Sequence, residues 1–163
     1  MKTLVVILCL LLVSQEYEIV CWIEQPYKSL IFKLNNMEEL VSTIYPDVSM
    51  IVDSRDGDIA GQIKRFGYWA PQNVEDFGRL IKKGDTLLNV GSHIGIETII
   101  FAKKTDGDAK VYFFEPYYIT RNILIKNIHF NNIARRATVY PYAAYNKKMK
   151  AYLMVSLRNT GAS

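Results

Sequence analysis

The chain has 163 residues, of which 50% are hydrophobic and 22% charged, and its formal net charge is +4. This length suits one domain, and the composition supports a packed core and excludes a largely disordered chain. The basic residues stand in short scattered pairs, such as Lys103-Lys104 and Arg135-Arg136, and do not gather on one element beside aromatic residues. A nucleic-acid partner is therefore not expected.

The N-terminus has the pattern of a secretory signal. Lys2 precedes an unbroken apolar run from Leu4 to Val13, which is too short for a membrane-spanning helix of roughly 20 residues. An apolar region of ~7–15 residues is typical of a signal peptide. Residues 1–21 are therefore interpreted as a signal peptide, which places the protein in the secretory pathway, secreted or lumenal. The alternative is an uncleaved signal anchor, which would then be the chain's one attachment to a membrane.

No metal site is expected. Both cysteines, Cys9 and Cys21, lie in the N-terminal segment, so the remainder of the chain has no cysteine to offer a metal. Asp53, Asp56 and Asp58 lie close together, but no bidentate glutamate follows at the spacing of a calcium loop. We interpret these three residues as a turn.

Residues 22–70 are expected to form a segment that precedes the main domain. Strand-forming and helix-forming patterns alternate in it, with turn residues between them. The expected elements are a strand at 27–34, a short helix at 36–40, a strand at 48–52, a turn at 53–58 and a helix at 59–66.

Residues 71–163 show a more regular alternation of strands and helices. We expect helices at 71–81 (with Lys82-Lys83 in its last turn and Gly84 as its stop), 94–103 and 117–130, and strands at 86–90, 110–114, 138–142 and 151–155. This spacing predicts parallel strands joined by right-handed crossovers, with helices on both faces of the sheet. The fold class is therefore α/β.

Two features of this region indicate a nucleoside site. Gly91 and Gly95 lie where a buried strand passes into a helix, so the backbone can approach a ligand closely. Glu115 ends the next strand, where an acidic residue accepts hydrogen bonds from the hydroxyls of a ribose. Glycine-rich turn and strand-end acid together predict that a nucleoside binds here. The alternative is that the glycines serve only the geometry of a tight turn and that no nucleoside binds.

The spacing of the glycines bears on which nucleoside binds. A dinucleotide site has G-x-G-x-x-G, which lets a pyrophosphate lie on the backbone. This chain has G-x-x-x-G, with Ser92-His93-Ile94 between the glycines. S-adenosylmethionine has no phosphate, and we therefore expect it as the cofactor in preference to NAD. An NAD-dependent oxidoreductase remains an alternative.

Several segments resemble the FkbM-type S-adenosylmethionine-dependent methyltransferases. Residues 84–98 resemble the first motif of that family, and Phe113-Phe114-Glu115-Pro116 resembles the second. The helix that carries Asn122, Leu124, Asn127 and Asn131 is similar to the helix that follows in the family, and Gly67-Tyr68-Trp69 is similar to an aromatic segment that precedes the domain. The resemblance runs from about residue 57 to residue 163.

The resemblance implies a Rossmann-like parallel sheet of the class I methyltransferase type, of which residues 71–163 supply the first part while the C-terminal half is missing. It implies O-methyl transfer to a hydroxyl of a sugar or of another small or glycan-linked molecule. Gly91, Ser92, His93 and Gly95 would hold the methionine and ribose of the cofactor, and Glu115 would bind the ribose hydroxyls.

Asn89 also belongs to the expected cofactor site, and it stands where the family usually has aspartate. No residue is assigned as catalytic base, because His93 lies in a loop that faces the methyl donor. A domain that keeps the fold without turnover is the alternative to an active enzyme.

Overall fold

The computed structural model describes residues 4–8, 37–106 and 108–154. In chain order, the elements are the strands β1 (Leu4–Leu8), β2 (Glu38–Ser42) and β3 (Ser49–Asp53), the helices α1 (Ile59–Phe66) and α2 (Pro71–Gly78), the strand β4 (Thr86–Val90), the helix α3 (Ile96–Lys104), the strand β5 (Lys110–Phe114), the helix α4 (Tyr118–Phe130) and the strand β6 (Ala137–Tyr140). The strand expected at 27–34 lies outside the described residues.

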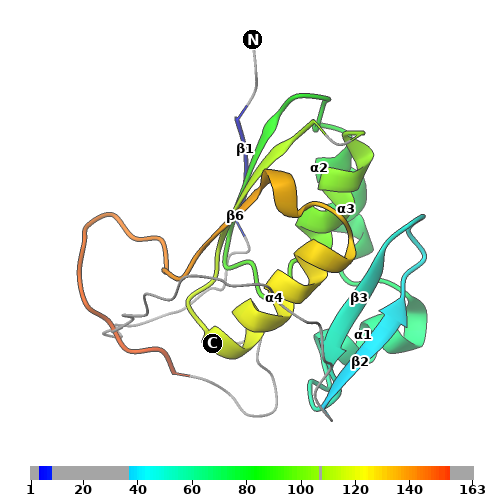
Figure 1. Ribbon diagram of the computed structural model, residues 1–163, viewed down its shortest axis with the longest axis horizontal. Helices are drawn as coiled ribbons and strands as arrows, with labels where there is room; N and C mark the ends of the chain where they lie inside the picture. Colours follow the sequence, from blue (N-terminus) through cyan, green and yellow to red (C-terminus); the bar gives the residue numbers. More distant parts are fainter. Residues whose placement is uncertain (1–3, 9–36, 107, 155–163) are drawn as a thin grey trace.

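The strands form one parallel sheet and one hairpin (Figure 1). The sheet has the order β1-β4-β5-β6 with parallel pairs throughout, and β2 pairs with β3 in antiparallel register. The strands β4, β5 and β6 follow one another across the sheet as in one half of a nucleotide-binding sheet, and β1 lies beside β4 at the other edge. The fold is therefore α/β and Rossmann-like.

The fourth place of the sheet is taken by β1, from the segment with the signal-like sequence. Leu4 pairs with Thr86 and Leu8 with Val90, so β1 lies along the whole edge of β4. In the described part of the chain, no helix has the length and apolar character needed to cross a membrane.

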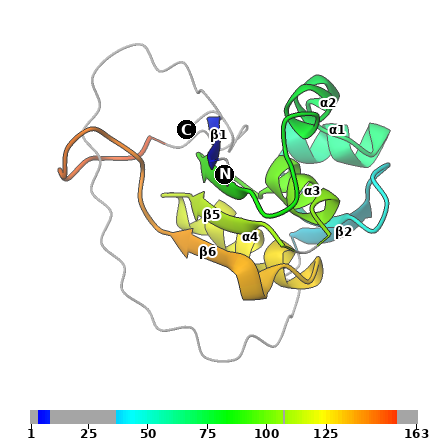
Figure 2. The same cartoon turned by 90° about the horizontal axis from the view of Figure 1, so that it is seen from above.

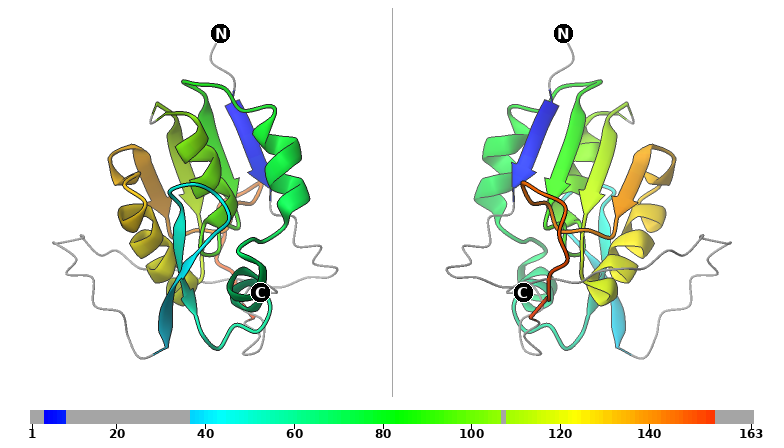
Figure 3. Two further views of the ribbon diagram at one scale, coloured as in Figure 1. Left: turned by 90° about the vertical axis from the view of Figure 1, so that its right-hand side faces the viewer. Right: turned by 90° about the vertical axis from the view of Figure 1, so that its left-hand side faces the viewer.

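The helices α3 and α4 cover one face of the sheet (Figures 2 and 3). Alternate strand residues on that face, including Leu87, Val111 and Phe113, are fully buried. The expected cover on both faces is not found in the described residues. The reason is topological: β4, β5 and β6 are successive neighbours, and right-handed crossovers that all step in one direction place their helices on one side.

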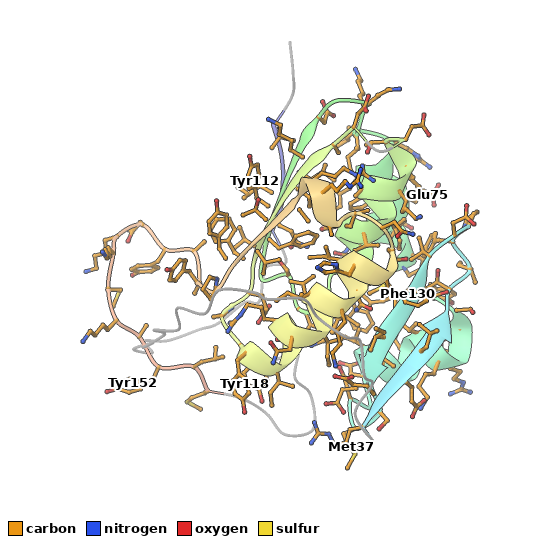
Figure 4. The ribbon with its side chains drawn as sticks, viewed as in Figure 1. Met37, Glu75, Tyr112, Tyr118, Phe130 and Tyr152 are labelled. Carbon is orange, nitrogen blue, oxygen red and sulfur yellow. The ribbon has the colours of Figure 1, made fainter. Side chains whose placement is uncertain are left out.

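The opposite face is half-buried and aromatic. The ring of Tyr140 stacks on Phe114, with centroids 4.8 Å apart, and on Tyr112 at 6.5 Å. Tyr112 points away from the helices (Figure 4). Stacked rings of this kind shield one another from water and hold the outer strands in register.

The β2–β3 hairpin is bound to α4 by asparagine side chains. The Oδ1 of Asn127 accepts the N–H of Ile51 (2.6 Å), and its Nδ2 donates to the carbonyls of Ile51 and Ile94 (3.0 Å each). One turn later, Asn131 bonds both backbone groups of Ser49 (3.3 and 2.8 Å). These two amides take the place of a neighbouring strand along the free edge of β3.

Three sequence predictions are corrected. Residues 38–42 form the strand β2 instead of continuing a helix from 36–40, because they pair with β3 and tertiary pairing overrides helix propensity. Helix α2 ends at Gly78, so Lys82-Lys83 lie in the following turn, where the Lys82 N–H donates to Asp85 (2.8 Å). The strand expected at 151–155 is reduced to a bridge at Ala151 within the described residues.

The amide of Asn127 generates the first prediction. Asn127→Ala leaves three buried backbone groups without their partner and is expected to lower the free energy of unfolding by about 3 kcal/mol. Asn122→Ala, on the exposed side of the same helix, should change it by less than about 0.5 kcal/mol. Urea unfolding measures both, and equal effects would contradict the role assigned to Asn127.

The edge of β4 generates the second prediction. Deletion of residues 1–8 removes β1 and leaves a row of unpaired backbone groups, which is a template for association with other chains. We expect concentration-dependent self-association in sedimentation velocity. Deletion of residues 1–3 alone keeps the strand and is the control. If both truncated chains stayed monomeric and equally stable, β1 would contribute nothing to the sheet.

Candidate nucleoside-binding site

The loop after β4 combines three left-handed backbone conformations. Gly91, His93 and Gly95 have φ of 74°, 49° and 83°, and Gly95 ends the turn so that α3 begins at Ile96, two residues later than expected. A Cβ at Gly95 would collide with Leu124 Cδ1 on α4. Glycine is therefore required at position 95 both by its conformation and by close packing.

The amides of this loop are turned inward. The N–H groups of Gly91 and Ser92 both donate to the carbonyl of Phe114 (3.0 Å each), and Gly95 N–H donates to the carbonyl of Ser92 (2.8 Å). The Ser92 hydroxyl accepts the N–H of Phe114 (3.1 Å). These contacts join the loop to the end of β5, and they leave few of its amides for an anion.

Glu115 lies at the centre of the expected site. Its Oε2 accepts the N–H of His93 (2.6 Å), and its Oε1 accepts the N–H of Tyr117 and the hydroxyl of Thr120 (3.0 Å each). Burial raises the pKa of its carboxyl, although these hydrogen bonds and Arg121 act in the opposite direction. The loop and the strand-end acid are therefore in direct contact, as the nucleoside-site prediction requires.

Asn89 lies beneath the loop on the covered face of the sheet. Its Nδ2 donates to the hydroxyl of Thr98 on α3, and Asn89 is 2% exposed. Among the described residues, its Oδ1 has no hydrogen-bond partner. A buried acceptor of this kind is costly unless a ligand or water donates to it.

The N-terminus of α3 already holds a carboxylate. Glu97, in the first turn of the helix, is buried and accepts a hydrogen bond from Asn73 Nδ2 (3.0 Å). The helix dipole stabilises this negative charge. A second anion at the same helix end would meet repulsion from Glu97.

A second segment, which no sequence pattern indicates, faces the loop. The turn between β3 and α1 brings the carboxylate of Asp56 to 4.0 Å from His93 Nε2. On the same turn Arg55 pairs with Asp53, with Nε–Oδ1 at 2.9 Å. Asp56 lies 37 positions before His93, so only the docking of the hairpin on α4 reveals the contact.

The predicted site residues therefore lie together. Asn89, Gly91, Ser92, His93 and Gly95 form the strand end and loop, and Glu115 binds the loop from the next strand. Sequence reasoning missed Asp56, Thr120 and Arg121. Within the described ranges, no three histidine, cysteine or carboxylate side chains are grouped so that they could hold a metal ion.

The environment of His93 generates the third prediction. Burial lowers the pKa of its imidazole from 6.5 to about 4, with Asp56 opposing this in part. Below pH 6.5 the unfolded chain then binds a proton that the folded chain excludes, so stability falls as the pH decreases from 6.5 towards 4. In His93→Asn the decrease in stability that comes from this histidine between pH 6.5 and pH 4 should disappear. His129→Asn, at an exposed position, is the control, and thermal unfolding against pH measures both.

Comparisons with known proteins do not assign the chain to a family. No protein-family model matches the chain, and no curated protein matches it in sequence. Among solved structures, the chain is similar to one from Pyrococcus horikoshii that is provisionally described as a transferase, with 21% identity and a TM-score of 0.48. The match covers 67% of this chain and 37% of the Pyrococcus protein.

Proposed function

We propose that this chain is part of an S-adenosylmethionine-dependent methyltransferase of the FkbM type, which methylates a hydroxyl of a sugar or of another small or glycan-linked molecule. The observation that carries the proposal is the bond from His93 N–H to the Glu115 carboxylate. It joins the glycine-rich loop to the strand-end acid, and this supports a nucleoside site that does not use the loop amides to bind a phosphate.

The inward amides favour this cofactor over NAD. A pyrophosphate needs free N–H groups and a helix N-terminus, but Gly91, Ser92 and His93 donate within the protein. The buried carboxylate of Glu97 stands at the start of α3. S-adenosylmethionine needs neither feature, because it carries a sulfonium and an ammonium group where NAD carries phosphates.

The residues present fit S-adenosylmethionine. Glu115 would accept hydrogen bonds from the ribose hydroxyls, using the acceptor capacity that remains beside its three protein donors. The Oδ1 of Asn89, which has no hydrogen-bond partner among the described residues, would accept a hydrogen bond from a ligand N–H. Gly91, Ser92, His93 and Gly95 would enclose the methionine and ribose.

When bound, the cofactor supplies a methyl group that is open to in-line attack by a hydroxyl oxygen. The protein's part is to hold donor and acceptor in line and to keep water from the sulfonium, which accounts for much of the rate in such transfers. The buried loop and the packed Gly95 make the donor side rigid. A base that takes the hydroxyl proton would add to the rate.

The proposal also includes a secretory location, on the pattern of residues 1–21. The same apolar run supplies β1. Cleavage of a signal peptide would remove the strand from the sheet, so one molecule cannot use the segment in both ways. An uncleaved segment that pairs with β4 is compatible with the fold described above.

The binding of S-adenosylmethionine is the fourth prediction. Isothermal titration of the full chain should give heat with S-adenosylmethionine and none with NADH. Glu115→Gln removes the charge and one acceptor, and it should weaken binding at least 10-fold, about 1.4 kcal/mol. Glu75→Gln, at an exposed carboxylate, should bind like the wild type.

Two results would count against the proposal. Heat with NADH alone would favour an oxidoreductase. No heat with millimolar S-adenosylmethionine would favour a domain that keeps the fold but has no catalytic activity. Circular dichroism of each variant establishes that the fold is retained, so that weak binding is not mistaken for unfolding.

A further inference from the structure

We propose that Asp56 is a positioning residue of the donor site, which acts by holding the imidazole of His93 in the tautomer that carries its hydrogen on Nε2. The inference rests on the proposed function for the identity of the ligand. Its structural basis is the approach of the β3–α1 turn to the loop after β4, where Asp56 Oδ2 lies 4.0 Å from His93 Nε2.

Asp56 is fixed from its own side. Its Oδ1 accepts the N–H groups of Asp58 and Ile59 (2.9 and 3.1 Å), so Asp56 caps the start of α1, whereas the side chain of Asp58 makes no capping bond. Its side chain is 3% exposed. One carboxylate oxygen therefore anchors the residue to α1, and the other faces the histidine.

His93 is fixed from the other side. Its φ of 49° is unusual for a residue with a side chain, and its N–H is held by Glu115 at 2.6 Å. The backbone of His93 is thus held in place, and its side chain is 15% exposed. Two carboxylates from different segments contact His93: Glu115 accepts its backbone N–H, and Asp56 lies near its imidazole.

The tautomer follows from the charge. A carboxylate near Nε2 favours a hydrogen on that nitrogen, and the 4.0 Å separation leaves the contact electrostatic or bridged by a water molecule. Nδ1 then carries the lone pair and is an acceptor. With two carboxylates close by, an acceptor at this place suits a cationic ligand group, and the ammonium of S-adenosylmethionine has this chemistry.

The variants separate the charge of Asp56 from its cap. Asp56→Asn keeps an oxygen for the N–H groups of Asp58 and Ile59 but removes the negative charge. His93→Asn places an acceptor oxygen near the position of Nδ1, and His93→Gln places its polar group nearer Nε2. Asp58→Asn, on the same turn, is the control.

The first experiment needs no ligand. Long-range proton–nitrogen NMR of the full chain should show the Nε2–H form of His93, and Asp56→Asn should shift it towards Nδ1–H. The pKa of His93 should fall further in this variant, because Asp56 raises it in the wild type. His129 in the same spectra is the internal reference. An unchanged tautomer in Asp56→Asn overturns the proposal.

The second experiment is a double-mutant cycle with S-adenosylmethionine. Asp56→Asn should raise the Kd about 10-fold with little change in melting temperature, and the same substitution should have no effect in the His93→Asn background. His93→Gln should bind more weakly than His93→Asn. Additive effects in the cycle overturn the proposal. If the wild type binds no S-adenosylmethionine, the proposed function fails, while the tautomer still decides the role of Asp56.

Discussion

The side-chain amide of Asn127 joins three parts of the molecule that are far apart in sequence. It is fully buried, and it bonds the N–H and the carbonyl of Ile51 on β3 and the carbonyl of Ile94 in the loop before α3. Together with Asn131, which bonds Ser49, it fixes the hairpin against α4. Helix α4 thereby sets the distance between the β3–α1 turn and the loop after β4, and the contact of Asp56 with His93 depends on that distance.

Three buried charges around the site are negative, and Arg121 beside Glu115 is positive. Asp56, Glu97 and Glu115 are all buried within or beside the loop and the start of α3. Buried carboxylates are costly, and a protein retains them where hydrogen bonds or a ligand of opposite charge offset the cost. Such a surrounding attracts a sulfonium and an ammonium group and repels a pyrophosphate, which agrees with the inward direction of the loop amides.

Local patterns were sufficient for much of the fold. The strands at 86–90 and 110–114 and the helix at 59–66 have the predicted bounds, because each is a short apolar or amphipathic segment with glycine or charged residues at its ends. The contact between the loop and Glu115 also followed from sequence, since parallel strands bring their carboxyl ends together.

Long-range pairing accounts for what sequence could not reveal. Residues 38–42 are a strand only because β3 lies beside them, and the apolar run at the N-terminus gave no sign that Leu4–Leu8 would pair with β4. Asp56 looked like part of an ordinary turn, because its partner comes from another part of the chain. In the described part of the chain the helices cover one face of the sheet, which follows from the direction of the crossovers, and residue patterns alone do not fix that direction.

The pairing of β1 with β4 cannot form until β4 has been synthesised. Leu4 and its partner Thr86 are 82 positions apart, and at roughly 5–20 residues per second the strand waits on the order of several seconds before β4 has been made. During that interval its apolar residues have no partner strand and are available to chaperones. The sheet therefore gains this edge strand only after more than half of the chain has been made.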